Sequence, residues 1–223
     1  MDSANALLRA KTLGSLLYFT RVFYRERTGR DFVISEPPGR ESHHITICRE
    51  LTNVMHGRTS RLLINVPPGH GKSELCIHFV AWAFAHYGDC QFIYVSYSHD
   101  LAAKHTAAIK SIIQLPLFKQ LYDREISNDS RARDNFKLVS GGAVRAVGSS
   151  GTITGTDAGL PAVNRFSGCL IMDDMHKPDE AHSDSMREGV VTNYNETIKY
   201  RARSSTVPFI FIGQRLHEVD LPQ

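Results

Sequence analysis

The sequence lacks any apolar run long enough to cross a membrane as a helix. Such a helix needs about 20 consecutive, mostly apolar residues, and the longest runs in this 223-residue chain are much shorter. The first 30 residues carry apolar side chains at helical spacing with arginines between them, but no continuous apolar core and no small-residue cleavage site. We therefore predict neither a membrane span nor a signal peptide.

Cysteine is scarce, and the sequence contains no CxxC pair. The four cysteines are Cys48, Cys76, Cys90 and Cys169. Isolated cysteines at such spacing favour buried reduced thiols over disulfides or a zinc site. This pattern suits a cytoplasmic protein.

Neither sign of charge is in large excess. Lysine and arginine number 26, aspartate and glutamate 23, and the net charge is +3. A balance this small does not by itself indicate a nucleic-acid partner. Hydrophobic residues make up 42% and charged residues 22%, which is typical of a globular domain with a substantial core.

Short apolar strands alternate with helical segments along the chain. We expect strands at 61–66, 91–97, 168–172 and 207–213, a hairpin of 136–139 with 143–147, and helices at 4–28, 45–55, 73–87, 100–113 and 178–200. This alternation predicts a three-layer α/β fold with a mostly parallel central sheet flanked by helices. We expect an N-terminal helical subdomain or lid over 1–57 and a core domain over 58–223.

The segment LLINVPPGHGKSE (62–74) combines a strand, a glycine loop and the start of a helix. Backbone N–H groups of such a loop can surround phosphate oxygens, and the helix points its positive end at the same anion. Lys72 would reach the β- and γ-phosphates of ATP, and the Ser73 hydroxyl would ligate Mg²⁺. The predicted nucleotide-binding residues of this loop are Pro68, Gly69, His70, Gly71, Lys72, Ser73 and Glu74.

This loop lacks the first glycine of the phosphate-loop pattern G-x-x-x-x-G-K-[ST], because Val66 stands there. The tripeptide GKS alone is common, so a glycine turn followed by a serine is the competing interpretation. The sequence also lacks the N/T-K-x-D motif that binds guanine, which disfavours a GTPase.

The acidic partner that such a loop needs is predicted in CLIMDD (169–174), about a hundred residues downstream. Asp173 would hold Mg²⁺ through a bound water. Asp174 would orient or deprotonate the attacking water, although many ATPases carry the longer glutamate there. Alone, the pair could equally be a surface turn after a strand.

Other polar residues complete the predicted site. Gln214 follows the strand 207–213 and could sense the γ-phosphate, or could simply be a polar strand end. Arg145 is our candidate for the arginine that neutralises charge on the transferred phosphate, with Arg165 as the second choice. His176 in DDMH occupies the place of the histidine in the DExH box of helicases, where it couples nucleotide to nucleic acid.

Five segments in order resemble the ATPase domain of the large terminase subunit of tailed bacteriophages: PPGHGKSE, SYSHDLA, GGAVRAVGSSGTITG, LIMDDMHKPDEAHSDSMRE and IGQRLHEVDL. The resemblance covers about residues 40–221 and implies a P-loop NTPase fold of the RecA/ASCE type. It also implies an ATPase that uses Mg²⁺ to translocate double-stranded DNA into a procapsid. The implied partners are the portal protein, a small terminase subunit and further copies in a ring, with a monomer expected in isolation. The motor would work in the host cytoplasm and transiently on the procapsid.

On this resemblance the Walker lysine is Lys72, the metal-binding serine Ser73, the Walker B aspartate Asp173 and the catalytic acid Asp174. The family's coupling segment falls on 212–221. The sequence departs from the family at Gly69, where members often carry arginine. Full terminases continue into a nuclease domain that this chain does not include, so we expect no nuclease activity from it.

Two other functions remain open. A helicase-like ATPase fragment of superfamily 2 would use DDMH as its second motif. A nucleotide-gated DNA-binding scaffold would bind ATP without turnover, which the aspartate at position 174 keeps possible. A small-molecule kinase is disfavoured because no acceptor-binding lid is evident.

Overall fold

The computed structural model describes residues 2–128, 134–151, 153, 155–177, 179, 183–214 and 216. The helices are α1 (Ser3–Gly14), α2 (Leu16–Thr28), α3 (His43–Met55), α4 (Lys72–His86), α5 (His99–Gln114), α6 (Pro116–Tyr122) and α7 (Asp184–Glu196), with the 3-10 helix η2 (Ile198–Arg201). The strands are β1 (Arg61–Asn65), β2 (Gln91–Ser96), β3 (Asn135–Lys137), β4 (Ala143–Gly148), β5 (Leu170–Asp173) and β6 (Phe209–Gly213). In these described residues, no helix combines the length and hydropathy needed to span a bilayer.

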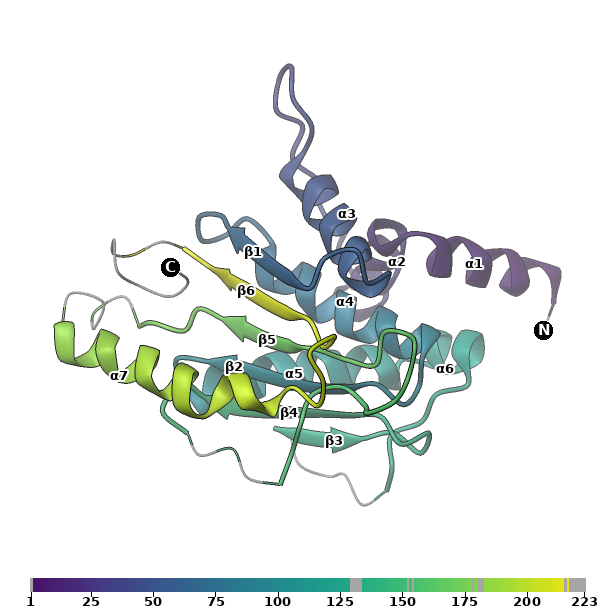
Figure 1. Cartoon of the computed structure of the whole chain (residues 1–223). Helices are drawn as coiled ribbons and strands as arrows, with labels where there is room; N and C mark the ends of the chain where they lie inside the picture. The colour runs from purple at the N-terminus through teal and green to yellow at the C-terminus, as the bar shows by residue number, and fades with distance from the viewer. Residues whose placement is uncertain are drawn as a thin grey trace.

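One six-stranded sheet organises the fold, in the order β1-β6-β5-β2-β4-β3. All neighbouring strands are parallel except the hairpin of β3 and β4. The carboxyl ends of the parallel strands therefore meet at one edge (Figure 1). The predicted α/β class and mostly parallel sheet are confirmed, as is the hairpin.

The position of β6 decides which loops become neighbours. Although β6 is the last strand in the sequence, it lies between β1 and β5 and pairs with both. The loop that follows β1 and the acidic pair at the end of β5 therefore lie on either side of the end of β6.

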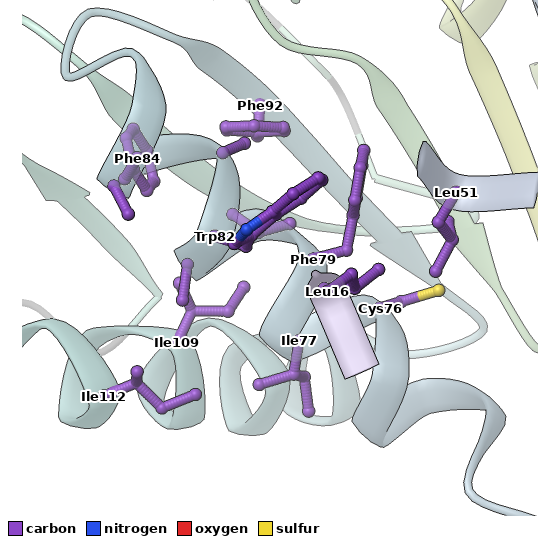
Figure 2. Close-up of a cluster of buried hydrophobic side chains, with 14 of the residues drawn as sticks. Leu16, Leu51, Cys76, Ile77, Phe79, Trp82, Phe84, Phe92, Ile109 and Ile112 are labelled. Carbon is purple, nitrogen blue, oxygen red and sulfur yellow. The ribbon is translucent and has the colours of Figure 1, made fainter. Parts of the chain in front are cut away.

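Helix α4 is buried on all sides. All its residues from Leu75 to Ala85 are buried, as expected for a helix that is apolar around its whole circumference. One side packs on the sheet and α5, and the other is covered by α2 and α3. Figure 2 shows Phe79, Trp82 and Phe84 of α4 in this cluster together with side chains of β2, α2, α3 and α5.

A second, smaller core fills the opposite face of the sheet. Ile93 and Val95 of β2 and Met172 of β5 belong to it, with Val190 and Tyr194 of α7 packed against them. Figure 1 shows α7 on this face and α4 and α5 on the other. Strand residues therefore alternate between the two cores, and this alternation sends the Asp173 side chain toward α4 and α5.

The N-terminal region shares the core of the sheet domain. The helical structure predicted over 4–28 is confirmed except at Ser15, which divides it into α1 and α2. Ser15 has extended backbone angles, and its side chain accepts a hydrogen bond from Tyr18 N as the N-cap of α2. A Gly–Ser pair disfavours a continuous helix because glycine has low helix propensity and serine favours the cap. Leu16, Phe19 and Phe23 of α2 join the cluster under α4, and the boundary at residue 57 stays a prediction.

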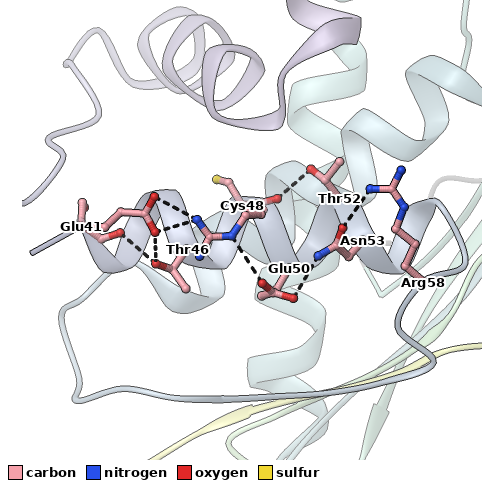
Figure 3. Close-up of polar contacts among 9 residues, drawn as sticks. Glu41, Thr46, Cys48, Glu50, Thr52, Asn53 and Arg58 are labelled. Atoms are coloured by element: carbon pink, nitrogen blue, oxygen red, sulfur yellow. Dashed lines mark hydrogen bonds and ion pairs between the residues drawn. The ribbon is translucent and has the colours of Figure 1, made fainter.

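Helix α3 is amphipathic. Ile47, Leu51 and Val54 face the core. On the other side, Figure 3 shows polar contacts of Glu41 with Thr46, Glu50 with Asn53, and Asn53 with Arg58, and Glu41 also forms an ion pair with Arg49. Exposed ion pairs of this kind add little stability. Helix α3 is therefore held mainly by its buried face.

Three further outcomes concern single elements. No helix was predicted after residue 113 and before the hairpin, but Pro116 begins α6, where its missing N–H costs no hydrogen bond. The helix predicted over 178–200 is shorter, because the described helix α7 ends at Glu196 and is followed by η2; residues 178 and 180–182 lie outside the described part. All four cysteines are buried and free, as predicted.

Candidate functional site

The loop between β1 and α4 has the backbone shape of an anion site. Gly69 and Gly71 have φ values of 78° and 74°, a left-handed conformation that glycine adopts without strain. Alternation of left- and right-handed residues turns successive N–H groups inward. Helix α4 begins at Lys72 and points its positive end at the same place.

Lys72 meets the acidic pair across the end of β6. Its side chain is 7% exposed, and Nζ lies 3.6 Å from Oδ2 of Asp174. Residues predicted from two motifs a hundred positions apart are thereby brought together. A phosphate group entering the loop would compete with Asp174 for the ammonium group.

Ser73 and Asp173 form the second contact between the motifs. Ser73 Oγ donates to Oδ1 of Asp173 over 3.1 Å. A hydroxyl that donates its proton keeps its lone pairs, so Ser73 can still present oxygen to a cation. Carboxylate, hydroxyl and phosphate oxygens are the donors that Mg²⁺ prefers, and these residues fit a Mg²⁺–nucleotide site.

Asp173 is completely buried. Burial raises the pKa of its carboxyl group to about 6, against the lowering effect of hydrogen bonds from Tyr94 and Ser73. The charge of Asp174 raises this pKa further, and that of Lys72 lowers it. The fold therefore places the Asp173 carboxylate where burial disfavours its negative charge. Carboxylates in such positions are typical of functional sites.

We expect Asp173→Asn to stabilise the nucleotide-free protein above pH 6. The folded-state pKa lies above the ordinary value of 3.8, so the folded protein retains a proton that the unfolded chain releases. Stability contributed by this group therefore falls as pH rises from about 4 to 6, by on the order of 3 kcal/mol. Asparagine removes that cost and can still accept from Tyr94. Denaturant titrations of both proteins between pH 4 and pH 8 measure the difference.

The matched control for this prediction is Asp100→Asn, since Asp100 is an exposed carboxylate in the first turn of α5. It should give no gain that grows with pH. If the difference between parent and Asp173→Asn is the same at pH 4 and pH 8, the buried charge does not cost stability.

Asp174 has an unusual backbone conformation, with a φ of 48°. Its N–H donates to Ile212 O over 2.8 Å, and its carbonyl accepts from Tyr97 N over 3.0 Å. Strained non-glycine residues persist where surrounding bonds impose them, and they cluster at functional sites. Here the conformation turns the chain after β5 and leaves the carboxylate partly exposed beside Lys72.

Glu74, predicted to bind nucleotide, points instead toward the helical layer. It forms an ion pair with Arg27 of α2, and His78 Nδ1 lies 3.1 Å from its Oε1. Burial raises the pKa of Glu74, but its hydrogen bond with His78 and the charges of His78 and Arg27 outweigh this and lower it overall. Arg27 was not predicted from the sequence, and it connects α2 to the first turn of α4.

Histidines from α3 cover the outside of the loop. His43 Nε2 donates to the carbonyl of His70 over 3.0 Å. Ser35 N donates to Nδ1 of His44 over 3.1 Å, which leaves Nε2–H toward the loop, 3.2 Å from where a Cβ on Gly71 would lie. A side chain at position 71 would therefore crowd His44 as well as strain the backbone.

Gln214 and His176 lie at the same edge of the sheet. Gln214 directly follows β6, and the Gly213 carbonyl accepts from Val66 N over 3.2 Å. His176 is buried and lines a cavity of about 390 Å³ between the acidic loop and α7. Residues 215 and 217–223, which contain most of the predicted coupling segment, lie outside the described part.

The structure does not bring either candidate arginine to this group. Arg145 pairs in register with Ile93, three residues before Ser96, which is opposite Asp173. It is thus about 10 Å away along the strands and two strands across, and it donates to Thr156. Arg165 stacks on Tyr87 and pairs with Asp89, just before β2, at the opposite edge of the sheet.

Two site residues were missed by the sequence reasoning. Tyr94 on β2 donates to Oδ2 of Asp173 over 2.8 Å, and His105 Nδ1 on α5 lies 3.3 Å from the same oxygen. Burial lowers the pKa of His105 to about 4, against the opposing charges of Asp174 and Glu74. The available signal was a tyrosine in a fully buried strand, where a hydroxyl needs a partner.

No family model matches the sequence, and no curated protein matches it. Among solved structures, the chain resembles the crystal structure of the large terminase of bacteriophage HK97, with a TM-score of 0.50 and 13% identity. The match covers 87% of this chain and 37% of that one, so this chain spans well under half the length of that terminase. At this identity the likeness concerns the fold: the predicted terminase-like fold is confirmed.

Proposed function

We propose that this chain is the ATP-hydrolysing motor domain of a terminase that translocates double-stranded DNA into a procapsid. One observation carries the proposal: Lys72 and Ser73 at the start of α4 contact Asp174 and Asp173 at the end of β5. The two motifs lie about a hundred positions apart in the sequence, and their meeting at one place in the fold supports the proposal.

The strand order supports assignment to the ASCE class of P-loop NTPases, within the RecA type. That class is named for an additional strand between the strand that precedes the phosphate loop and the strand that ends at the acidic residue. Here these two strands are β1 and β5, and β6 lies between them. The terminase-like fold supports the more specific assignment.

ATP would lie with its phosphates in the loop 66–73, within reach of Lys72. Mg²⁺ would be held by Ser73 and Asp173, where it would neutralise charge on the β- and γ-phosphates. Asp174 would orient the attacking water and accept its proton. Gln214 is proposed to sense the γ-phosphate from the end of β6.

An arginine is still required to neutralise charge in the transition state. Arg145 lies too far across the sheet to reach the phosphates of its own subunit in this conformation. We propose that a neighbouring subunit supplies the arginine, so that the competent form is a ring. The portal protein, a small terminase subunit and duplex DNA are the proposed partners, in the cytoplasm of a bacterial host.

The deciding test measures ATP hydrolysis with and without Mg²⁺ and linear duplex DNA, at protein concentrations high enough for assembly. We expect Mg²⁺-dependent turnover that duplex DNA stimulates, without strand separation. Unwinding of the duplex would identify a helicase-like enzyme instead. Tight ATP and DNA binding without turnover would identify a nucleotide-gated scaffold.

A further inference from the structure

The two carboxylate oxygens of Asp173 have different surroundings. Oδ1 faces the loop and accepts from Ser73 over 3.1 Å. Oδ2 faces away from the loop, where it accepts from the Tyr94 hydroxyl over 2.8 Å and lies 3.3 Å from His105 Nδ1. Asp173 therefore lies between the proposed Mg²⁺ site at its Oδ1 and the side chains of Tyr94 and His105 at its Oδ2.

Tyr94 and His105 belong to one rigid unit. Tyr94 is completely buried in the central part of β2, and its ring meets the imidazole of His105 edge-on, with centroids 5.1 Å apart. Helix α5, which carries His105, packs directly on β2. Neither side chain can move without disturbing the core around it.

Unsatisfied polar atoms lie on the same face of the sheet. Ser96 Oγ and His105 Nδ1 are buried and have no hydrogen-bond partner among the described residues. Ser96 is opposite Asp173 in register and on the Tyr94 side of β2. The His105–Asp173 contact is close, but its angle is outside hydrogen-bond geometry. Each such atom in a native protein calls for an explanation, such as strain, a catalytic role, or a bound water or ion.

We propose that Tyr94 and His105 are positioning residues for the metal site. The Tyr94 hydroxyl holds Oδ2 by a hydrogen bond and His105 packs beside both groups, so that Oδ1 remains directed at Ser73 and at the ion or its bound water. The inference rests on the proposed function, because it assumes that Mg²⁺ binds with ATP at Ser73 and Asp173. Tyr94 and His105 lie on either side of the SYSHDLA segment (96–102), which connects β2 to α5.

The physical reason is that a carboxylate can rotate about its terminal bond. Such torsions are broad and roughly two-fold, so a buried aspartate needs partners to present one oxygen in one direction. Groups behind a metal ligand perform this task at many sites, and their loss weakens metal affinity 10- to 100-fold. Nucleotide contacts to the loop itself do not involve them.

The test is the Mg²⁺ dependence of nucleotide binding by Tyr94→Phe. This change removes one hydroxyl and keeps the ring. Titrating Mg²⁺ against a fluorescent ATP analogue, we expect the half-maximal Mg²⁺ concentration to rise about 10-fold or more. Affinity for the analogue in EDTA should stay within about 2-fold of the parent.

The matched control is Tyr122→Phe. Tyr122 is also buried and donates one hydrogen bond, to Thr12 Oγ1 over 2.7 Å, away from the site. The Tyr122→Phe variant loses a comparable hydrogen bond, but we expect its Mg²⁺ requirement to equal that of the parent.

A second pair of variants keeps the test decisive if Tyr94→Phe folds poorly. His105→Leu should raise the Mg²⁺ requirement, and the requirement of His105→Asn should lie closer to that of the parent, because its amide keeps a polar group beside Oδ2. If the parent binds ATP with Mg²⁺ but the Tyr94 and His105 variants match Tyr122→Phe, the inference is overturned. If the parent does not bind ATP at all, the proposed function fails and the inference fails with it.

Discussion

Replacing Lys72 with alanine is expected to abolish stabilisation of the protein by Mg-ATP. Its ammonium group is the positive side chain that the structure places at the loop and beside Asp174. The loop has no arginine, since Gly69 occupies the position where related loops often carry one, so Lys72 and the α4 dipole supply most of the local positive charge. Without Lys72, the phosphates would face Asp173 and Asp174 with little compensation.

The size of the effect follows from ligand linkage. A ligand at 100 times its dissociation constant stabilises the folded state by about 2.7 kcal/mol. For a domain of this size, that corresponds to a rise in melting temperature of about 5–10 °C. We expect this rise for the parent and none for Lys72→Ala in thermal melts with and without Mg-ATP.

Lys11→Ala is the control, because Lys11 is exposed on α1 and carries the same charge. It should keep the full rise. A rise in Lys72→Ala equal to that of the parent would show that ATP does not bind at the loop.

Replacing Asp174 with asparagine is expected to separate binding from turnover. Asparagine has nearly the same shape and tolerates the left-handed backbone that φ of 48° requires, so the loop after β5 should keep its conformation. It cannot accept the proton of the attacking water. Loss of a general base costs about 10²- to 10⁴-fold in rate, and we expect a fall of at least about 100-fold.

Two measurements check this prediction on the same preparation: steady-state ATP hydrolysis with duplex DNA, and equilibrium binding of a fluorescent ATP analogue. Binding should persist, and could tighten, because removing the carboxylate frees Lys72 from a competitor 3.6 Å away. Asp100→Asn should hydrolyse like the parent. Turnover by Asp174→Asn at the parental rate would exclude Asp174 as the catalytic acid.

The fold was largely predictable because its elements are locally encoded. The apolar run of β1, the glycines and lysine that follow it, and the wholly apolar α4 are each recognisable in a short window. Errors came where a local signal was weak: the break at Ser15 and the start of α6 depend on capping and on the geometry of one proline. The break at Ser15 changes only where one helix stops and another begins, whereas α6 adds a helix over 116–122 that was not predicted.

The site was predictable only as two separate halves. The loop 66–73 and the pair Asp173–Asp174 each carry a motif, whereas Tyr94 and His105 carry none. A tyrosine in a buried strand and a histidine in a helix have many ordinary roles. Their relation to Asp173 arises from strand register and from the packing of α5 on β2, which no short window of sequence contains.

By itself, the sequence determined the class of fold, and it predicted a phosphate loop and the acidic residues opposite it, because backbone propensity, apolar periodicity and motif chemistry act over a few residues. Only the tertiary structure decided which groups meet. β6 lies between β1 and β5, and across its end Lys72 contacts Asp174 and Ser73 contacts Asp173. β2 lies between β5 and β4, and it therefore keeps Arg145 two strands away from this group. Pairing between strands distant in sequence sets these distances, and that pairing follows from burying both faces of one sheet at once.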